Sequence, residues 1–577
     1  MKLESKMTKG VGIRNARYNT NGFPDWFTGR NGCGVGRKTK EKPEHGKVLA
    51  IFVVAMLLLS VVAVLTWQST SASVIKINAG PKMEIKYTPR WPIYIKGNAN
   101  FTSANGVIGG SGTQNDPYII AGWEIDANGG PYGIWIENTD AYFVIRNCNV
   151  YGATGSGSAP YGAGIALNNV THGTLDSNKC DNSNFGIYLY GGSQYNTITN
   201  NNASGNSYYG IYLYSSSNNN ITNNNASGIS LVSSSNNNIT NNNASGTYYG
   251  VYLDSSSNNN ITNNNASGNS DCGIYLWHSS NNNITNNNAS GNSRYGIHLY
   301  DSSNNTITNN TASGNSEAGI YLGDSGNNTI TNNNASGNSG GDYGYGIYLR
   351  HSSNNTITNN AASGNSGWYF GLGIYLWYSS NNTITNNNAS GNGGGRSSSG
   401  ILLSSSSNNS ITNNTASGNS YNGIYLSSSS DNIIIYNWVC NNAYYGVYIT
   451  SSSRGNTIHH NNFIGNGATA LRYLSQGAST DTPNGAGRGV NGNCQAYDDV
   501  GGNSWYDTTT QEGNYWSNWD GQGWGTANAY PIAGGAGASD WYPLGNPVAE
   551  FNSMPLFVLA LASLLILARV RKPHKHS

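Results

Sequence analysis

Histidine and aspartate residues recur at nearly constant spacing in the middle of the chain. His278, Asp301, Asp324 and His351 follow one another at intervals of 23, 23 and 27 residues. Imidazole and carboxylate groups bind divalent copper or zinc, and two carboxylates held close together repel each other unless a cation lies between them. If the fold places these residues in one file, they could form a metal site. Two alternatives are that Arg350 neutralises Asp324, or that the file is a solvent-exposed corner, since other copies hold serine there.

Aromatic residues form a second recurrent pattern. Many copies of a G-I-Y-L-Y segment carry Tyr or Trp at the third and fifth positions. Rows of outward-facing rings combine apolar area with a polar group, which suits stacking against sugars. Packing of the rings against one another between neighbouring strands is the alternative. The candidate glycan-stacking residues are Tyr252, Tyr275, Trp277, Tyr300, Tyr321, Tyr348, Tyr375 and Trp377.

Both patterns arise because one segment is repeated. From about residue 175 to 460 the segment SSSNNNITNNNASGNSxYGIYLY recurs, and the isoleucine of its N-x-I-T part is spaced by 18 to 27 residues. A period in this range predicts a solenoid. The N-x-I-T and G-I-Y-L-Y parts are too short for helices, the second alternates with a period of two, and Asn, Ser and Gly suit the corners. The L-x-x-L-x-L frame of leucine-rich repeats is absent. We therefore predict an all-β protein, a parallel β-helix of about 15 coils stacked roughly 4.8 Å apart.

Asparagine columns support the same fold. The residue two before the repeat isoleucine is Asn in all twelve copies from 196 to 456, and the residue two after it is Asn in ten, with Tyr436 and His460 as exceptions. Stacked amides bond from coil to coil and satisfy buried polar groups without charge. The predicted structural ladder is Asn196, Asn219, Asn237, Asn259, Asn282, Asn305, Asn328, Asn355, Asn382, Asn409, Asn432 and Asn456. The repeat also creates glycosylation sequons, for example at Asn202, Asn220 and Asn304.

The charge is low and unevenly distributed. Charged residues make up 10% of the chain and the net charge is +1. Residues 1–47 contain eleven Lys and Arg but four Asp and Glu, and residues 569–577 contain four basic residues and no acidic one. The remaining chain therefore has a net charge of −10. This balance disfavours a basic nucleic-acid-binding protein, so no nucleic-acid partner is expected.

Two apolar runs predict an association with a membrane. Residues 48–67 carry no charge over 20 residues, enough to span a bilayer, and residues 554–568 form a shorter run followed by Arg-Val-Arg-Lys. The basic flanks lie at the outer ends of the chain, so both termini are expected in the cytoplasm and residues 70–550 outside the cell. A cleaved signal peptide, with a small-residue site at Ser71-Ala72-Ser73, is the alternative for the first run. The spacing of the cysteines also leaves open a Cys148–Cys180 bridge.

Longer motifs carry a family resemblance. Residues 94–148 include YIKGNANFTSANGVIGGSGTQNDPYIIAGWEIDANG, and the chain closes with Gly513-Asn514-Tyr515-Trp516 and Asp540-Trp541-Tyr542-Pro543-Leu544. With the N-x-I-x-N coils, these segments resemble the NosD-type right-handed β-helix family over residues 90–545. The resemblance implies a right-handed coil, periplasmic-type copper or other divalent-metal binding, and a relation to carbohydrate-binding and sugar-hydrolase β-helix modules. The end of the chain, with Ala549-Glu550-Phe551 before its apolar run, resembles archaeal C-terminal sorting tails, which direct processing and lipid attachment.

A carbohydrate-active enzyme is a further alternative. Asn138-Thr139-Asp140 resembles a tripeptide of polygalacturonase-like hydrolases, but the G-H-G and R-I-K segments of those enzymes are absent. The tripeptide by itself is more typical of a corner in the chain. The sequence therefore favours a binding or structural protein over a polysaccharide lyase or hydrolase.

These observations predict six segments: a basic cytoplasmic segment (1–47), a transmembrane helix or signal anchor (48–67), an N-terminal cap (75–118), the β-helix (119–465), an irregular C-terminal cap (466–547), and an apolar helix with a basic tail (548–577). We expect a cell-membrane protein whose main domain is extracellular and contacts polysaccharide or neighbouring envelope proteins. Copper or other divalent-metal binding is the first alternative function, and a polysaccharide lyase or hydrolase is the second.

Overall fold

The computed structural model describes residues 86–157, 159–395, 398–467, 495–519 and 529–548. The predicted segments 1–47 and 48–67, and all of 548–577 except Val548, lie outside these residues. Within the described residues, no helix has the length and apolar character needed to cross a membrane. The only helical turns described are η1 (Asn98–Asn100) and η2 (Ser103–Asn105), both near the start of the fold.

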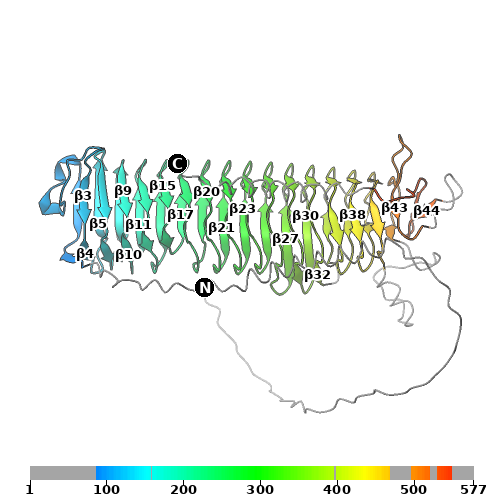
Figure 1. The fold of residues 1–577 in the computed structure, drawn as a ribbon, viewed down its shortest axis with the longest axis horizontal. Coiled ribbons are helices and arrows are strands. Elements are labelled where there is room, and N and C mark those ends of the chain that lie inside the picture. The colour runs from blue at the N-terminus through cyan, green and yellow to red at the C-terminus, as the bar shows by residue number, and fades with distance from the viewer. Residues whose placement is uncertain (1–85, 158, 396–397, 468–494, 520–528, 549–577) are drawn as a thin grey trace, which may run out of the picture. The chain divides into compact units, whose positions relative to one another are not determined.

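Parallel strands of successive coils stack into two long sheets that run the length of the solenoid (Figure 1). The first, called the long sheet here, contains 16 strands: β2 (Ile93–Lys96), β5 (Tyr132–Thr139), β8 (Ala163–Val170), β11 (Phe185–Tyr190), β14 (Tyr209–Tyr214), β17 (Ile229–Val232), β19 (Val251–Asp254), β21 (Cys272–Trp277), β23 (Tyr295–Tyr300), β25 (Ala318–Gly323), β27 (Tyr343–Arg350), β30 (Phe370–Trp377), β33 (Ile401–Ser404), β36 (Ile424–Ser427), β39 (Val447–Thr450) and β42 (Ala496–Asp498).

The second sheet is built from the N-x-I-T segments. Its 15 strands are β3 (Tyr118–Ala121), β6 (Phe143–Arg146), β9 (Gly173–Asp176), β12 (Thr197–Thr199), β15 (Asn220–Thr222), β18 (Asn238–Thr240), β20 (Asn260–Thr262), β22 (Asn283–Thr285), β24 (Thr306–Thr308), β26 (Thr329–Thr331), β28 (Thr356–Thr358), β31 (Thr383–Thr385), β34 (Ser410–Thr412), β37 (Ile433–Ile435) and β40 (Thr457–His459).

A third face closes each coil. Its strands are β1 (Thr88–Arg90), β4 (Trp123–Asp126), β7 (Asn149–Tyr151), β10 (Lys179–Asp181), β13 (Asn202–Ala203) and β16 (Asn225–Ala226) at one end, and β35 (Thr415–Ser417), β38 (Trp438–Cys440), β41 (Asn462–Ile464) and β43 (Tyr515–Trp516) at the other. Isolated parallel bridges, such as Asn265 to Asn288, join the coils between them. Two smaller pairs are β29 (Ser366–Gly367) with β32 (Gly393–Gly394), and β44 (Tyr530–Pro531) with β45 (Ser539–Asp540).

The core is a file of aliphatic residues along the axis of the solenoid. In one typical coil Ile297, Leu299, Ile307 and Ala312 are all fully buried, and the same positions are buried in the neighbouring coils. Each Ile or Leu removed from water stabilises the fold by about 1.5–3 kcal/mol. The predicted all-β parallel β-helix, with inward-facing isoleucines, is confirmed.

The structure places the predicted asparagine ladder inside the solenoid. The backbone N–H of each of the twelve residues donates to the Oδ1 atom of the next one, for example Asn282 to Asn305 at 2.8 Å and Asn305 to Asn328 at 2.7 Å. All are at most 2% exposed. Asn456 extends the ladder to Asn503 at 3.0 Å. The amides thereby satisfy backbone donors at the corners, where no strand partner is present.

The second predicted asparagine column does not enter the solenoid. Asn223, two residues after its isoleucine, is exposed and has a φ of 58°, whereas the next residue, Asn224, is buried. The left-handed residue turns the corner and thereby directs the following side chain inward. The second buried ladder therefore consists of residues three after the isoleucine, and runs from Asn178 to Asn461 and on to Asn514.

Two further polar ladders bring the number of buried polar ladders in the described coils to four. One consists of asparagines at the third corner and runs from Asn269 to Asn466, ending on Gln495. The other consists of serines from Ser216 to Ser453, each backbone N–H donating to the next hydroxyl oxygen at 2.9–3.0 Å. The low charge of the repeat is therefore compatible with a closely hydrogen-bonded interior.

The ends of the solenoid extend past the boundaries expected from the sequence. Strands β1 and β2 of the predicted N-terminal cap already pair with the coils, and β42 and β43 of the predicted C-terminal cap continue two of the faces. The proposed bridge between Cys148 and Cys180 is not formed, because both cysteines are buried as free thiols. Burial raises the pKa of both thiols.

Candidate functional site

Six aromatic rings form a continuous stack on the outer face of the long sheet. They come from six successive coils, and neighbouring ring centroids are 4.5–5.4 Å apart: Tyr252, Tyr275, His298, Tyr321, Tyr348 and Tyr375. We call this set the ring stack. His298 was missed by the sequence analysis, although it occupies the tyrosine position of its coil. Because each ring lies against the next, the stack offers ring edges and hydroxyl groups to a ligand instead of open ring faces.

A second row of side chains packs beside the ring stack. Tyr249, Tyr295, Tyr345 and Leu372 precede the strand glycines of their coils, and they form a hydrophobic cluster with the stack that is separate from the solenoid core. Tyr321 is consequently only 7% exposed. Burial raises the pKa of Tyr275 and of Tyr375 to about 12, so these hydroxyl groups remain hydrogen-bond donors at neutral pH.

The exposed aromatic residues lie two positions further along the same strands. Trp277 and Tyr300 are aligned in neighbouring coils and each is 38% exposed. Trp377 is partly covered by the guanidinium group of Arg350, which lies 5.2 Å from its ring. Of the predicted glycan-stacking residues, Trp277 and Tyr300 therefore have the most accessible rings.

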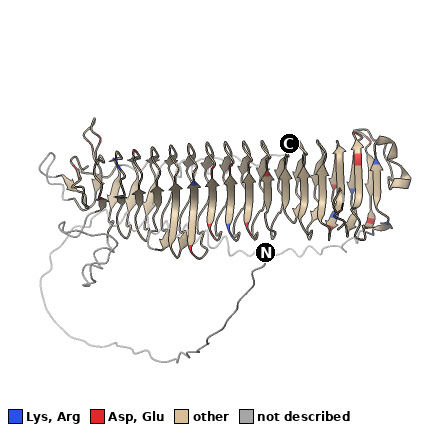
Figure 2. Cartoon of the chain, turned by 180° about the vertical axis from the view of Figure 1, so that it is seen from behind, with Lys and Arg blue, Asp and Glu red and all other residues tan. Residues whose placement is uncertain are grey.

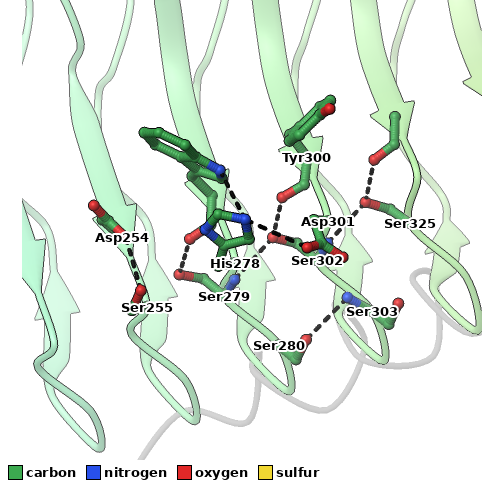
Figure 3. A network of polar contacts seen from close by, with 12 residues as sticks. Asp254, Ser255, His278, Ser279, Ser280, Tyr300, Asp301, Ser302, Ser303 and Ser325 are labelled. Carbon is green, nitrogen blue, oxygen red and sulfur yellow. Dashed lines mark hydrogen bonds and ion pairs between the residues drawn. The ribbon is translucent and has the colours of Figure 1, made fainter.

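The predicted metal-binding residues occupy one corner of the coil. His278, Asp301, Asp324 and His351 all have φ values of 47–50°, the left-handed conformation with which the chain leaves the long strand. Nε2 of His278 lies 3.3 Å from Oδ2 of Asp301, and Figure 3 shows the two side chains facing each other above the serine ladder. The indole N–H of Trp277 also donates to this Nε2 atom, at 3.1 Å.

The other two residues of this corner column, Asp324 and His351, do not approach the contact between His278 and Asp301. The ring of His351 stacks on Tyr378, with centroids 5.0 Å apart. Asp324 and Arg350 form no ion pair, and the charge of Asp324 adds only a minor contribution to the raised pKa of Arg350, after the hydroxyl group of Tyr321. Within the described ranges, no three His, Cys, Asp or Glu side chains gather closely enough to hold a metal ion.

Comparison with known protein families identifies the fold. The family model described as "Right handed beta helix region" matches residues 108–227, 217–360 and 341–484, which together exceed half of the chain. The chain belongs to the right-handed β-helix family. No match was found among curated proteins.

Several solved structures share weak similarity with this β-helix protein. The periplasmic alginate epimerase AlgG is 14% identical, with a TM-score of 0.30, over 61% of this chain and 80% of that one. The mannuronan C-5 epimerase AlgE4 A-module of Azotobacter vinelandii is 15% identical, with a TM-score of 0.32, over 64% and 96%. The Dettilon tailspike protein is 14% identical, with a TM-score of 0.30, over 66% and 60%. At this level the similarities add nothing to the family assignment.

Charged residues of this β-helix form a second file, at the other end of the same strands. Asp271, Arg294 and Glu317 occupy one position in three successive coils, where earlier coils hold Tyr208 and Tyr248. Nε of Arg294 lies 3.0 Å from Oε2 of Glu317. Figure 2 shows how sparse charges are elsewhere on the coils. These three residues were not predicted as a site, although charged residues at one position in three successive coils stand out in a repeat that has no charge from 182 to 253.

His298 and the neighbouring Cys272 are largely buried and uncharged, as expected for packed side chains. Its Nδ1 atom lies 3.9 Å from Sγ of Cys272, while its Nε2 atom is enclosed without a hydrogen-bond partner. Burial, followed by the charge of Arg294, lowers the pKa of His298 to about 3. Burial also raises the pKa of Cys272 well above its usual value, so the thiol stays protonated and is a poor nucleophile. The outer face therefore provides aromatic edges, neutral donors and a few paired charges.

Proposed function

We propose that the chain is a membrane-anchored protein of the cell envelope whose extracellular β-helix binds polysaccharide along the outer face of the long sheet. The observation that carries this proposal is the alignment of the accessible Trp277 and Tyr300 rings beside the half-buried ring stack. The ring stack contributes one ring in each of six successive coils, and this periodic surface suits a polymer of repeated units. Apolar ring area next to neutral hydroxyl donors matches the two kinds of surface that a sugar presents.

The membrane anchor and the extracellular location are supported by the sequence. The uncharged run 48–67 and the basic residues at the two outer ends of the chain favour this placement. The sequons at Asn202 and Asn304 lie at exposed positions of the coils, which is compatible with glycosylation outside the cell. We further propose that the protein is of the NosD type and that its C-terminal tail is an archaeal-type sorting signal.

A binding experiment tests the central proposal. The full-length chain should bind members of an array of neutral and uronic-acid oligosaccharides, and Trp277→Ala with Tyr300→Ala should weaken binding about tenfold, the loss of roughly 1.4 kcal/mol of stacking. Tyr436→Ala is a matched control, because Tyr436 is equally exposed, at 38%, but lies at the corner after β37 of the second sheet. Absence of binding to every glycan would refute the proposal.

Two alternatives can be separated in the same preparations. Release of new reducing ends or of unsaturated sugars from a bound glycan would identify a hydrolase or lyase instead of a binding protein. Divalent-metal binding has a single supporting observation, the contact between His278 and Asp301. Metal analysis of the purified full-length chain tests it directly.

A further inference from the structure

Three neighbouring coils are enlarged at the same place. The segments from Ala335, Ala362 and Ala389 to the next strand glycine are four residues longer than the corresponding segment from Ala312 to Gly319. The added residues keep their register from coil to coil, since Ser339 bridges to Ser366 and β29 pairs with β32. In Figure 1 these enlarged coils project beyond their neighbours near β27, β30 and β32.

The inserted residues include Trp368, whose indole ring has no other aromatic ring stacked on it among the described residues. Gly341, Trp368 and Gly395 occupy equivalent positions in the three coils, and the backbone N–H of Trp368 donates to the carbonyl oxygen of Gly341 at 2.7 Å. The side chain of Trp368 is 77% exposed. In the ring stack, by contrast, Tyr348 has a ring on both sides, at 5.0 and 4.8 Å. Since glycine has no side chain, the equivalent position of either neighbouring coil places no side chain against the indole.

The inserted residues also border a shallow hollow of about 650 Å³ that is largely open to solvent. We call it the insertion pocket; its lining residues are Ser339, Gly341, Ser366, Gly367, Trp368, Gly394 and Gly395. The hydroxyl oxygens of Ser339 and Ser366 are 3.0 Å apart. None of these lining residues carries a charge, so the pocket offers one apolar ring, two hydroxyl groups and backbone polar groups.

The glycines of the pocket have two different roles. A Cβ atom on Gly394 or on Gly395 would lie 2.3 or 2.0 Å from a carbonyl oxygen of the preceding coil, so close backbone packing requires glycine there. A Cβ atom on Gly341 would meet no atom within 4 Å. The space beside Gly341 is therefore open, and it lies on the side of the pocket next to the indole.

We propose that the insertion pocket is a subsite for a neutral polysaccharide, in which the apolar face of one sugar ring stacks on Trp368 and the hydroxyl groups of Ser339 and Ser366 bond to the sugar. The inference rests on the proposed function and adds to it a second place on the solenoid, with one chemical class of ligand. A neutral sugar is favoured over a charged one because no lining residue carries a positive charge that would attract a carboxylate.

The test uses the full-length chain on neutral hexose oligosaccharides and on uronic-acid oligosaccharides. Trp368→Ala should weaken binding of a neutral glycan about tenfold, and Trp368→Phe should restore part of it. Gly341→Asn should also weaken binding, because its side chain enters the open space and asparagine tolerates the φ of 73°. Tyr369→Ala is the matched control: this residue is adjacent and 53% exposed, but it does not line the pocket.

The outcomes separate this inference from the proposed function. Neutral-glycan binding that is lost in Trp368→Ala and kept in Tyr369→Ala supports the subsite. Wild-type binding that is unchanged in Trp368→Ala overturns the subsite and leaves the proposed function standing. Loss of only uronic-acid binding overturns the assignment to neutral sugars. A wild-type chain that binds no glycan overturns both proposals.

Discussion

The backbone N–H of Asn514 donates to Oδ2 of Asp540 at 2.7 Å, at the point where the second asparagine ladder ends. In that ladder each Nδ2 atom donates to the Oδ1 atom of the next asparagine toward the C-terminal end, as from Asn461 to Asn514 at 2.9 Å, so the last asparagine needs an acceptor beyond it. A buried carboxylate therefore terminates the ladder. Asp498 has a similar place beside the first ladder, where it accepts from Nδ2 of Asn503 at 3.1 Å.

The first prediction concerns Asp540→Asn and pH. Burial raises the pKa of Asp540 from 3.8 to about 6, so the folded state holds this proton more tightly than the unfolded chain. The stability from this group is present below pH 3.8 and is lost as pH rises through 6, by about 3 kcal/mol. The free energy of unfolding should therefore differ between pH 4 and pH 7 by about 2 kcal/mol more in the wild type than in Asp540→Asn, since pH 4 lies just above the lower pKa. Urea unfolding monitored by tryptophan fluorescence measures this, with Asp431→Asn at an exposed corner as the control.

The second prediction concerns His298→Tyr, which restores the usual residue of the repeat. Since burial lowers the pKa of His298 from 6.5 to about 3, only the unfolded chain takes up a proton between these values. The contribution to stability is present above pH 6.5 and is lost as pH falls toward 3, amounting to about 2 kcal/mol between pH 7 and pH 5. The variant should be the more stable protein at pH 5 in urea unfolding. Equal pH profiles for the two proteins would contradict the enclosed position of this ring.

The third prediction concerns the first asparagine ladder. Asn305→Ala removes the acceptor of the Asn282 backbone N–H, so it should lower the free energy of unfolding by about 1–3 kcal/mol for each buried group left without a partner. Asn304→Gly is the control, because Asn304 is exposed and has a φ of 59°, which glycine adopts without strain. Urea unfolding of both variants tests the ladder, and similar stabilities would argue against it.

The fourth prediction concerns metal binding by His278 and Asp301 at the corner of the coil. Two ligands from His278 and Asp301 fall short of the four of a structural zinc site, so we expect less than one copper or zinc ion per chain after dialysis. Metal analysis by mass spectrometry checks this on the full-length protein. A stoichiometric metal that disappears in Asp301→Asn would show that further ligands join the pair.

The fifth prediction concerns the ring stack. Tyr348→Ala removes a ring that contacts Tyr321 and Tyr375, and should cost about 3–5 kcal/mol, as for other truncations of a packed aromatic residue. Tyr348→Phe keeps the ring and should remain close to the wild type. Thermal unfolding of the two variants distinguishes packing of the rings from a role of the hydroxyl group alone.

The repeat by itself determined the class of fold, the inward isoleucines and the ladder from Asn196 to Asn456. The physical reason is that a constant period places equal positions in one file, and an apolar residue flanked by polar ones has one stable orientation, toward the axis. Counting along the chain is sufficient for such features, because each depends on its own coil and the next.

Only the tertiary structure decided which asparagine of each N-N-N run is buried, because the direction of a side chain after a left-handed corner is set by the backbone. It also decided that His278 meets Asp301 while His351 turns to Tyr378, and that the tyrosine faces cover one another. The pocket at Trp368 needed three coils in register, with glycine on both sides of the indole. These features depend on contacts between coils and on the path of the inserted backbone. Neither can be predicted from the spacing of residues in the sequence.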